Sequence, residues 1–135
     1  MSQDNIAFVR GLYEAFGRGD VPTVLAGLAD DIEWNESEGM PYGGQYHSPQ
    51  EVAENVFAPI PNDFEDFSVK PEEILADGER VVVLLTYRGT GKESGKALQM
   101  PAAHVWTVRD GKVTKFVQLA DSAIMNAALA VEAAV

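Results

Sequence analysis

The sequence of 135 residues contains no cysteine. Disulfide bonds and thiolate chemistry are therefore excluded, and any metal ion would need histidine or carboxylate ligands. Long apolar runs are also missing, since none approaches the roughly 20 residues that a membrane-spanning helix needs. The N-terminus, MSQDNIAFVR, has no basic segment followed by an apolar run. No signal peptide is expected, and the predicted location is the cytoplasm.

Basic residues are few: 10 Lys and Arg stand against 21 Asp and Glu, which gives a net charge of −11. Binding to a nucleic acid backbone or to an anionic membrane surface needs clustered Lys and Arg, so neither is an expected partner. The length fits a single domain spanning residues 1–135. A hydrophobic fraction of 46% is in the ordinary range for a globular protein and allows one core.

Apolar residues at spacings of three and four predict a helix over residues 4–16, with Asp4 or Asn5 as its N-cap. Glycines end this helix, and Asp20 is expected to cap a second, short one that has Pro22 in its first turn. The remaining predicted helices cover residues 49–57, opened by a Ser cap and a proline, and residues 122–132.

The rest of the chain reads mostly as strands joined by tight turns, with ADGER and RDGK as hairpin signals. The predicted strands cover residues 31–38, 64–76, 80–89, 96–108 and 112–120, and a Gly-rich loop covers 39–47. This order predicts an α+β domain in which three N-terminal helices pack on the concave face of a curved antiparallel sheet, followed by a short C-terminal helix. The strand VVVLL is apolar on both faces, so a second copy of the chain is expected to cover the outer face as a homodimer.

Four segments, FGRGD, LADDIEW, GGQYHSPQEV and VWTVRDGKVTKFVQLAD, resemble the SnoaL-like polyketide cyclases of the nuclear transport factor 2-like superfamily. Ketosteroid isomerases and limonene epoxide hydrolases belong to the same superfamily. The resemblance covers nearly the whole chain and implies a cone-shaped fold that encloses a mostly apolar pocket. Because the superfamily holds isomerases, cyclases, hydrolases and non-catalytic modules, the fold alone does not name a reaction.

The stretch DIEWNESEG contains four carboxylates, which strand alternation divides between two faces. Ile32 and Trp34 define the inward face, so Glu36, and with it Glu38, is expected to point into the pocket. The resemblance places Glu36 near the general-base carboxylate of ketosteroid isomerases, although that residue is an aspartate. Burial would raise the pKa of such a carboxyl and tune it for proton transfer near neutral pH. The alternative is that the strand ends near Asn35 and Glu36 faces water.

His104 is the second candidate, on the same strand face as Trp106. If the RDGK turn is one residue shorter than the corresponding turn in the isomerases, the resemblance puts His104 where they keep a protonated carboxylic acid; otherwise Ala103 takes that position. A neutral histidine there would donate a hydrogen bond to an enolate oxygen or act as a base. The alternative is a core histidine that a neighbouring side chain satisfies.

Three further polar side chains are candidates. Gln118 lies roughly where the cyclases carry a catalytic acid, but an amide orients a carbonyl and cannot move a proton. Asp121 is a candidate for the pocket and equally for the N-cap of the last helix. Tyr13 stands one position from the oxyanion-hole tyrosine of the isomerases, a position that Leu12 occupies here, so it either reaches the pocket or packs in the core.

Large aromatic side chains are expected to form the pocket wall, and core packing would explain them equally well. The predicted ligand-binding residues are Tyr13, Trp34, Tyr46, Phe57, Tyr87, Trp106 and Phe116. A metal site built from Glu36, His47 and His104 is not expected, because the chain has no HxH or HExxH spacing. The prediction is a cofactor-independent isomerase or cyclase that acts on a small, largely apolar carbonyl compound, or else a non-catalytic binding or assembly module of the same fold.

Overall fold

The computed structural model describes residues 2–131. Within this range the helices are α1 (Ser2–Gly17), α2 (Val21–Ala26), α3 (Pro49–Val52), α4 (Ile60–Asp63) and α5 (Ser122–Leu129), and a π-helical segment, η1 (Ala53–Phe57), continues α3. The strands are β1 (Leu28–Glu36), β2 (Gly44–Tyr46), β3 (Phe64–Asp77), β4 (Arg80–Gly91), β5 (Ala97–Arg109) and β6 (Lys112–Ala120).

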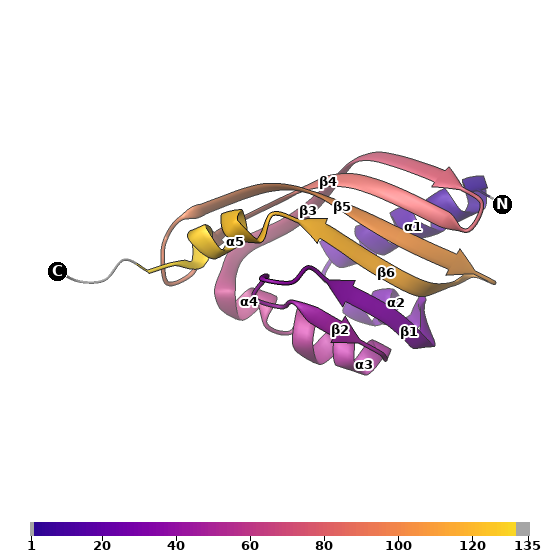
Figure 1. Ribbon diagram of the computed structural model, residues 1–135, viewed down its shortest axis with the longest axis horizontal. Coiled ribbons are helices and arrows are strands. Elements are labelled where there is room, and N and C mark those ends of the chain that lie inside the picture. The colour runs from indigo at the N-terminus through magenta and orange to yellow at the C-terminus, as the bar shows by residue number, and fades with distance from the viewer. Residues whose placement is uncertain (1, 132–135) are drawn as a thin grey trace.

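The strands form one six-stranded sheet in the order β2-β1-β6-β5-β4-β3, and the predicted α+β class is confirmed. The sheet curves around α1, α2 and α3, which lie on its inner side, while α5 follows the last strand (Figure 1). The expectation of a wholly antiparallel sheet is wrong, because β1 pairs with β6 in parallel. Two parallel strands need a long connection, which the helices and strands between β1 and β6 provide.

Strand β1 is shifted towards the N-terminus relative to its predicted range of 31–38. It begins at Leu28 and ends at Glu36, and its side chains alternate in burial from Ile32 to Glu36. Glu38 lies beyond the strand and is exposed, so the expectation that it follows Glu36 inward is wrong. Part of the predicted loop is the short strand β2, which pairs antiparallel with β1 and sets Trp34 opposite Tyr46.

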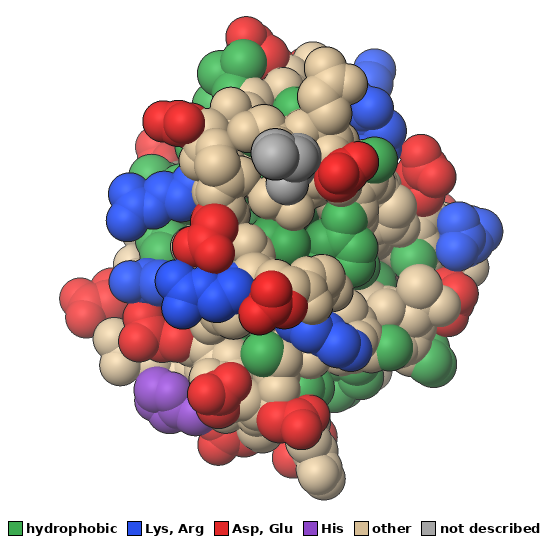
Figure 2. Space-filling view, turned by 90° about the vertical axis from the view of Figure 1, so that its right-hand side faces the viewer, with side chains coloured by type: hydrophobic (Ala, Val, Ile, Leu, Met, Phe, Trp, Pro, Cys, Tyr) green, Lys and Arg blue, Asp and Glu red, His purple; other side chains and the backbone are tan. Residues whose placement is uncertain are grey.

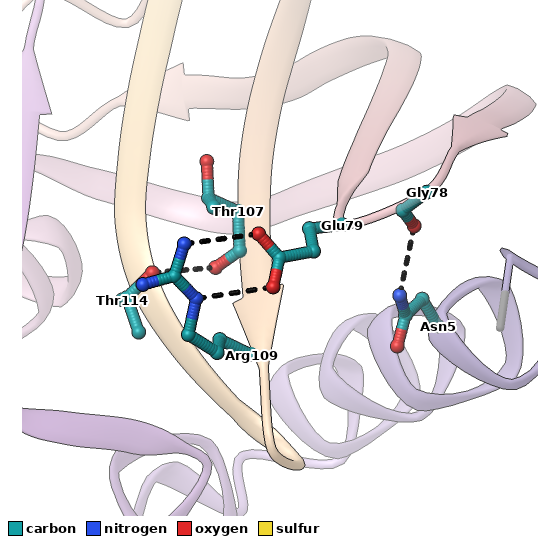
Figure 3. Close-up of polar contacts among 6 residues, drawn as sticks. All are labelled: Asn5, Gly78, Glu79, Thr107, Arg109 and Thr114. Carbon is teal, nitrogen blue, oxygen red and sulfur yellow. Dashed lines mark hydrogen bonds and ion pairs between the residues drawn. The ribbon is translucent and has the colours of Figure 1, made fainter.

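Side chains at one end of the molecule connect α1 to the two hairpin turns (Figure 3). The helix starts at Ser2, so neither Asp4 nor Asn5 is its N-cap; instead the Asn5 amide donates a hydrogen bond to the Gly78 carbonyl at 2.9 Å. Glu79, next in the β3–β4 turn, forms two hydrogen bonds of 3.0 and 3.1 Å with Arg109 at the end of β5. The first contact ties α1, the helix that carries Tyr13, to the β3–β4 turn, and the second ties that turn to the end of β5.

Of the two remaining helical predictions, one differs from the structure in the type of helix and the other in where the helix ends. Residues 49–57 are helical as predicted, but only 49–52 are α-helix, and the rest is the π-helical segment. Such segments are rare and frequently occur at functional sites. Helix α5 ends at Leu129, short of the predicted end at residue 132, and residue 132 lies outside the described residues.

Apolar side chains fill the space between the helices and the inner face of the sheet. On the opposite face several large apolar side chains remain exposed, with Leu75 at 54% and Leu119 at 57%. At the end of the molecule where α1 begins, acidic and basic side chains are interspersed over the surface (Figure 2). None of the helices in residues 2–131 is long and apolar enough to cross a membrane.

Candidate functional site

An apolar cavity of about 70 Å³ lies between the helices and the inner face of the sheet. Its wall comes from α1, α2, η1, α4 and α5 and from all the strands except β2. Among its mostly hydrophobic lining, the side chains with polar atoms are Tyr13, Trp34, Glu36, Tyr42, Tyr87, His104, Trp106 and Gln118. Ligand sites usually have this composition, but their volumes are typically several hundred Å³. The cavity therefore suits a small molecule.

Glu36 enters the cavity as the last residue of β1. Because side chains alternate along a strand, it shares the inward face with Ile32 and Trp34, and it is 7% exposed. Its Oε1 accepts a hydrogen bond from the Trp34 indole nitrogen at 2.8 Å. No residue between 2 and 131 forms a hydrogen bond with its Oε2. Burial raises the pKa of Glu36 to about 7, and the Trp34 hydrogen bond opposes part of that rise.

His104 reaches the cavity from β5, and Ala103 points to the other face of the sheet. The imidazole lies between two tyrosines: Nδ1 is 2.6 Å from the Tyr13 hydroxyl, and Nε2 hydrogen-bonds to the Tyr87 hydroxyl. Burial lowers the pKa of His104 to about 3, because a charged ring would lose its hydration there. The ring is therefore neutral near pH 7, with both nitrogens engaged.

Gln118 on β6 connects the surroundings of Glu36 with those of His104. Its Oε1 accepts a hydrogen bond from the Ser37 backbone N–H at 3.1 Å, and its Nε2 donates to the Tyr87 hydroxyl at 3.0 Å. The Ser37 hydroxyl in turn donates to the backbone carbonyl of Gln118 at 2.7 Å. Because the Ser37 N–H can only donate, the amide of Gln118 has a defined orientation.

The cavity wall around these groups is aromatic. Trp34 stacks on Phe116 with ring centroids 3.8 Å apart, and both rings meet Trp106 edge to face. The indole nitrogen of Trp106 donates to the Tyr13 hydroxyl at 2.9 Å. Phe57 packs against Trp34 from η1. Such pairs contribute beyond their buried area and hold the polar groups in place.

Of the predicted site residues, only Asp121 and Tyr46 lie outside the cavity wall. Asp121 is exposed and caps α5, accepting a hydrogen bond from the Ala123 N–H at 3.1 Å. Tyr46 is half-buried, and its hydroxyl donates to the Tyr42 carbonyl at 2.9 Å. The cavity wall includes Tyr13, Trp34, Glu36, Phe57, Tyr87, His104, Trp106, Phe116 and Gln118.

Two further residues that matter for the geometry were not among the predicted site residues. Ser37 orients the side chain of Gln118. Alternation over the predicted strand 31–38 puts the Ser37 side chain on the outer face, but β1 ends at Glu36, so the alternation does not extend to Ser37. Tyr42 lines the cavity from the loop after β1 and donates to Asp63 at 2.7 Å. Within residues 2–131 no group of three His, Cys, Asp or Glu side chains is placed to hold a metal ion.

Comparisons with known proteins agree with this fold. An NTF2-like protein from Burkholderia pseudomallei, of unknown function, is 36% identical, with a TM-score of 0.88 over 97% of this chain and 100% of its own. An NTF2-like protein from Burkholderia thailandensis is 31% identical, with a TM-score of 0.89 over 93% and 97%. TerC, co-crystallised with polyporic acid, is 29% identical, with a TM-score of 0.84 over 93% and 97%.

No curated protein matches the sequence. A family model described as the SnoaL-like domain matches residues 9–116. This range includes Tyr13, Glu36 and His104, and the family resemblance predicted from the sequence motifs is thereby confirmed. The chain belongs to the SnoaL-like domain family.

Proposed function

We propose that this protein catalyses removal of a proton next to the carbonyl group of a small, largely apolar molecule, giving isomerisation or intramolecular ring closure. The observation that carries the proposal is Glu36: its carboxylate lies in an apolar cavity, has a pKa of about 7, and leaves Oε2 without a hydrogen-bond partner in residues 2–131. A base is most effective when its pKa lies near the working pH.

In the proposed reaction, Oε2 of Glu36 takes a proton from the carbon beside the carbonyl. The electron pair of the broken C–H bond moves into an enolate, whose oxygen needs a hydrogen-bond donor in the cavity. In an isomerisation, the protonated Glu36 returns the proton to a different carbon. In a ring closure, the carbanion attacks a second carbonyl carbon, whose π electrons move to its oxygen, and Glu36 gives the proton to the alkoxide so formed. These steps use only side chains of the protein.

His104 is a weaker candidate for the base. Its pKa of about 3 leaves it a poor proton acceptor, and both ring nitrogens already have hydrogen-bond partners. The size of the cavity, about 70 Å³, favours a monocyclic or smaller compound. The relative TerC was co-crystallised with polyporic acid, which supports a small organic molecule as the ligand here too.

The test is the conversion of 3-cyclohexen-1-one to its conjugated isomer, followed by the rise in ultraviolet absorbance. We expect Glu36→Gln to lower kcat by 10²- to 10⁴-fold, because general-base catalysis contributes roughly that factor. The glutamine keeps an oxygen for the Trp34 hydrogen bond, so the fold is expected to persist. Gln3→Glu, on the exposed side of α1, is the matched control. Equal rates in the wild type and Glu36→Gln would contradict the assignment.

The alternative is a non-catalytic small-molecule binder. One observation favours it: of the buried ionisable groups that line the cavity within residues 2–131, Glu36 alone has a pKa near neutrality, since burial raises the pKa of the tyrosines and lowers that of His104. The two functions separate in the same experiment, because a binder would take up the ketone, detected by chemical-shift changes of cavity residues, without converting it and without exchanging its acidic hydrogens for deuterium in D₂O.

We also propose that the outer face of the sheet binds a second copy of the chain. Strand register puts two rows of apolar side chains side by side on that face: Leu75, Val82, Val105 and Val117, and beside them Leu84, Ala103 and Leu119. A contiguous exposed apolar surface of this kind commonly marks an interface. Leu84 is 41% exposed and Leu119 57%, so both are available to a partner.

Leu119→Glu is expected to convert a dimer into a monomer, because it puts a charge at one end of the second apolar row, where a partner would bury it. Sedimentation equilibrium measures the change in mass. Gln3→Glu adds the same charge on α1, away from this face, and should remain dimeric. A wild-type protein that is monomeric at high micromolar concentration would rule out the interface.

A further inference from the structure

The groups around His104 contain one hydrogen more than their mutual hydrogen bonds use. Tyr13 and Tyr87 each carry one hydroxyl hydrogen, and neutral His104 carries one ring N–H. The three groups are joined by two links, from Tyr13 to Nδ1 and from Tyr87 to Nε2. Each link takes one hydrogen. One hydrogen is therefore left over, and it belongs to a tyrosine hydroxyl, since neutral imidazole donates from one nitrogen and accepts at the other.

Among the side chains of residues 2–131, no hydrogen-bond acceptor is in contact with the leftover hydrogen. The Trp106 indole nitrogen and the Gln118 amide nitrogen are the other partners of the two hydroxyls, and both are donors. The Trp106 N–H cannot accept, and the Gln118 amide is oriented by the Ser37 N–H. Both tyrosines line the cavity. Whichever hydroxyl keeps the spare hydrogen is consequently a donor for a ligand.

The position of Glu36 distinguishes the two arrangements. The side-chain amide of Gln118 makes two hydrogen bonds: its oxygen accepts from the backbone N–H of Ser37, the residue after Glu36, and its nitrogen donates to the Tyr87 hydroxyl. Tyr13 lies on the far side of the imidazole from this chain of contacts. The charge of Glu36 also contributes to raising the pKa of Tyr87, after the larger effect of burial. A hydroxyl hydrogen that makes no hydrogen bond carries partial positive charge, so its energy is lower near the Glu36 carboxylate. This preference selects Tyr87 as the residue that keeps the spare hydrogen.

We propose that His104 is a positioning residue held as the Nε2–H tautomer, and that the hydroxyl hydrogen of Tyr87 is the donor that a ligand's carbonyl oxygen accepts. In this arrangement Tyr13 donates to Nδ1, and Nε2–H donates to the Tyr87 oxygen. Two hydrogen bonds to that oxygen, from His104 and Gln118, make its O–H a better donor. This inference rests on the proposed function for its substrate class: a small ketone whose acidic C–H faces Glu36 while its oxygen faces Tyr87.

The first measurement needs neither ligand nor turnover. The chain has two histidines, so a spectrum that correlates ring ¹⁵N with ring carbon-bound protons contains two patterns, and His47→Gln identifies His104. We expect Nδ1 of His104 to give the shift of an unprotonated acceptor and Nε2 that of an N–H at pH 8, where Glu36 is mostly charged. A hydrogen on Nδ1, a charged ring or an averaged pair of shifts would overturn the proposal.

The second measurement compares two probes, 2-cyclohexen-1-one and cyclohexene, which differ in the carbonyl group. The wild type should bind the ketone about 10-fold more tightly than the alkene, as judged by chemical-shift titration. Tyr87→Phe is expected to abolish this preference, and Tyr13→Phe to retain it. Loss of the preference in Tyr13→Phe only would overturn the assignment to Tyr87.

The outcomes separate this inference from the proposed function. An Nε2–H tautomer and a ketone preference that depends on Tyr87, found in a protein that converts no 3-cyclohexen-1-one, would support the inference and reject the function. Conversion that depends on Glu36, together with an Nδ1–H tautomer, would support the proposed function and reject this inference.

Discussion

At pH 8 the Glu36→Gln variant is expected to be more stable than the wild type by about 3 kcal/mol. The pKa of this carboxyl is raised from 4.5 to about 7 in the folded protein, and one pKa unit corresponds to about 1.4 kcal/mol. The folded state therefore binds a proton between pH 4.5 and 7 that the unfolded state has lost, so wild-type stability falls as pH rises through this window. Glutamine does not titrate, so the variant does not lose this stability as pH rises.

The measurement is urea unfolding of both proteins at pH 4, 6 and 8. The difference between the variant and the wild type should grow by about 3 kcal/mol from pH 4 to pH 8, whatever its value at pH 4. A difference that stays constant with pH would mean that Glu36 titrates normally, and the proposed base would lose its main support.

His104→Phe should show the opposite pH dependence. The pKa of this ring is lowered from 6.5 to about 3, so the unfolded state binds a proton that the folded state refuses below pH 6.5. The wild type accordingly loses stability as pH falls through this range, by about 3 kcal/mol at pH 4 relative to pH 7. Phenylalanine has no such loss.

At pH 7 the same variant is expected to be less stable than the wild type, because Tyr13 and Tyr87 both lose a hydrogen-bond partner. Each poorly satisfied buried group costs about 1–3 kcal/mol. The stability deficit should shrink as pH falls from 7 to 4, which thermal or urea unfolding at each pH would reveal. Parallel pH profiles of the two proteins would contradict a neutral, buried His104.

The opposite signs of these two effects have a joint result in the wild type. Between pH 4.5 and 6.5 the stability lost at Glu36 as pH rises is matched by the stability gained at His104. The two residues together are expected to flatten the pH dependence in this window, and Glu36→Gln should restore a slope that rises with pH.

The fold could be predicted from local patterns, and the failures have identifiable causes. Alternation along β1 correctly predicted that Trp34 and Glu36 face inward. Successive side chains of a strand point to opposite faces, so the burial of the apolar residues fixes the direction of the others. The same rule extended too far, to Ser37 and Glu38, since nothing in the sequence marks the residue at which pairing stops. The parallel pairing of β1 with β6 was also missed, because strand order depends on contacts between distant segments.

For the candidate site, side-chain direction was predictable but hydrogen-bond partners were not. His104 and Gln118 were expected to face inward, and both are buried there. That the His104 ring would meet a tyrosine on each side depends on how α1 crosses the sheet, which the sequence of β5 does not encode. Asp121 had a local alternative, the helix N-cap, and its observed contact with the Ala123 N–H matches that alternative.

The parallel pairing of β1 with β6 has a consequence for how the protein forms. Trp34 lies beside Phe116, and Asn35 beside Val117, across about 80 residues of intervening chain. Closing so long a loop is costly in entropy before its contacts form, so this pair is expected to assemble after the local hairpins of β3 to β6. During synthesis, Glu36 leaves the ribosome long before β6 and remains in water until that strand arrives. The cavity is thus expected to close when β1 pairs with β6, after the hairpins have formed.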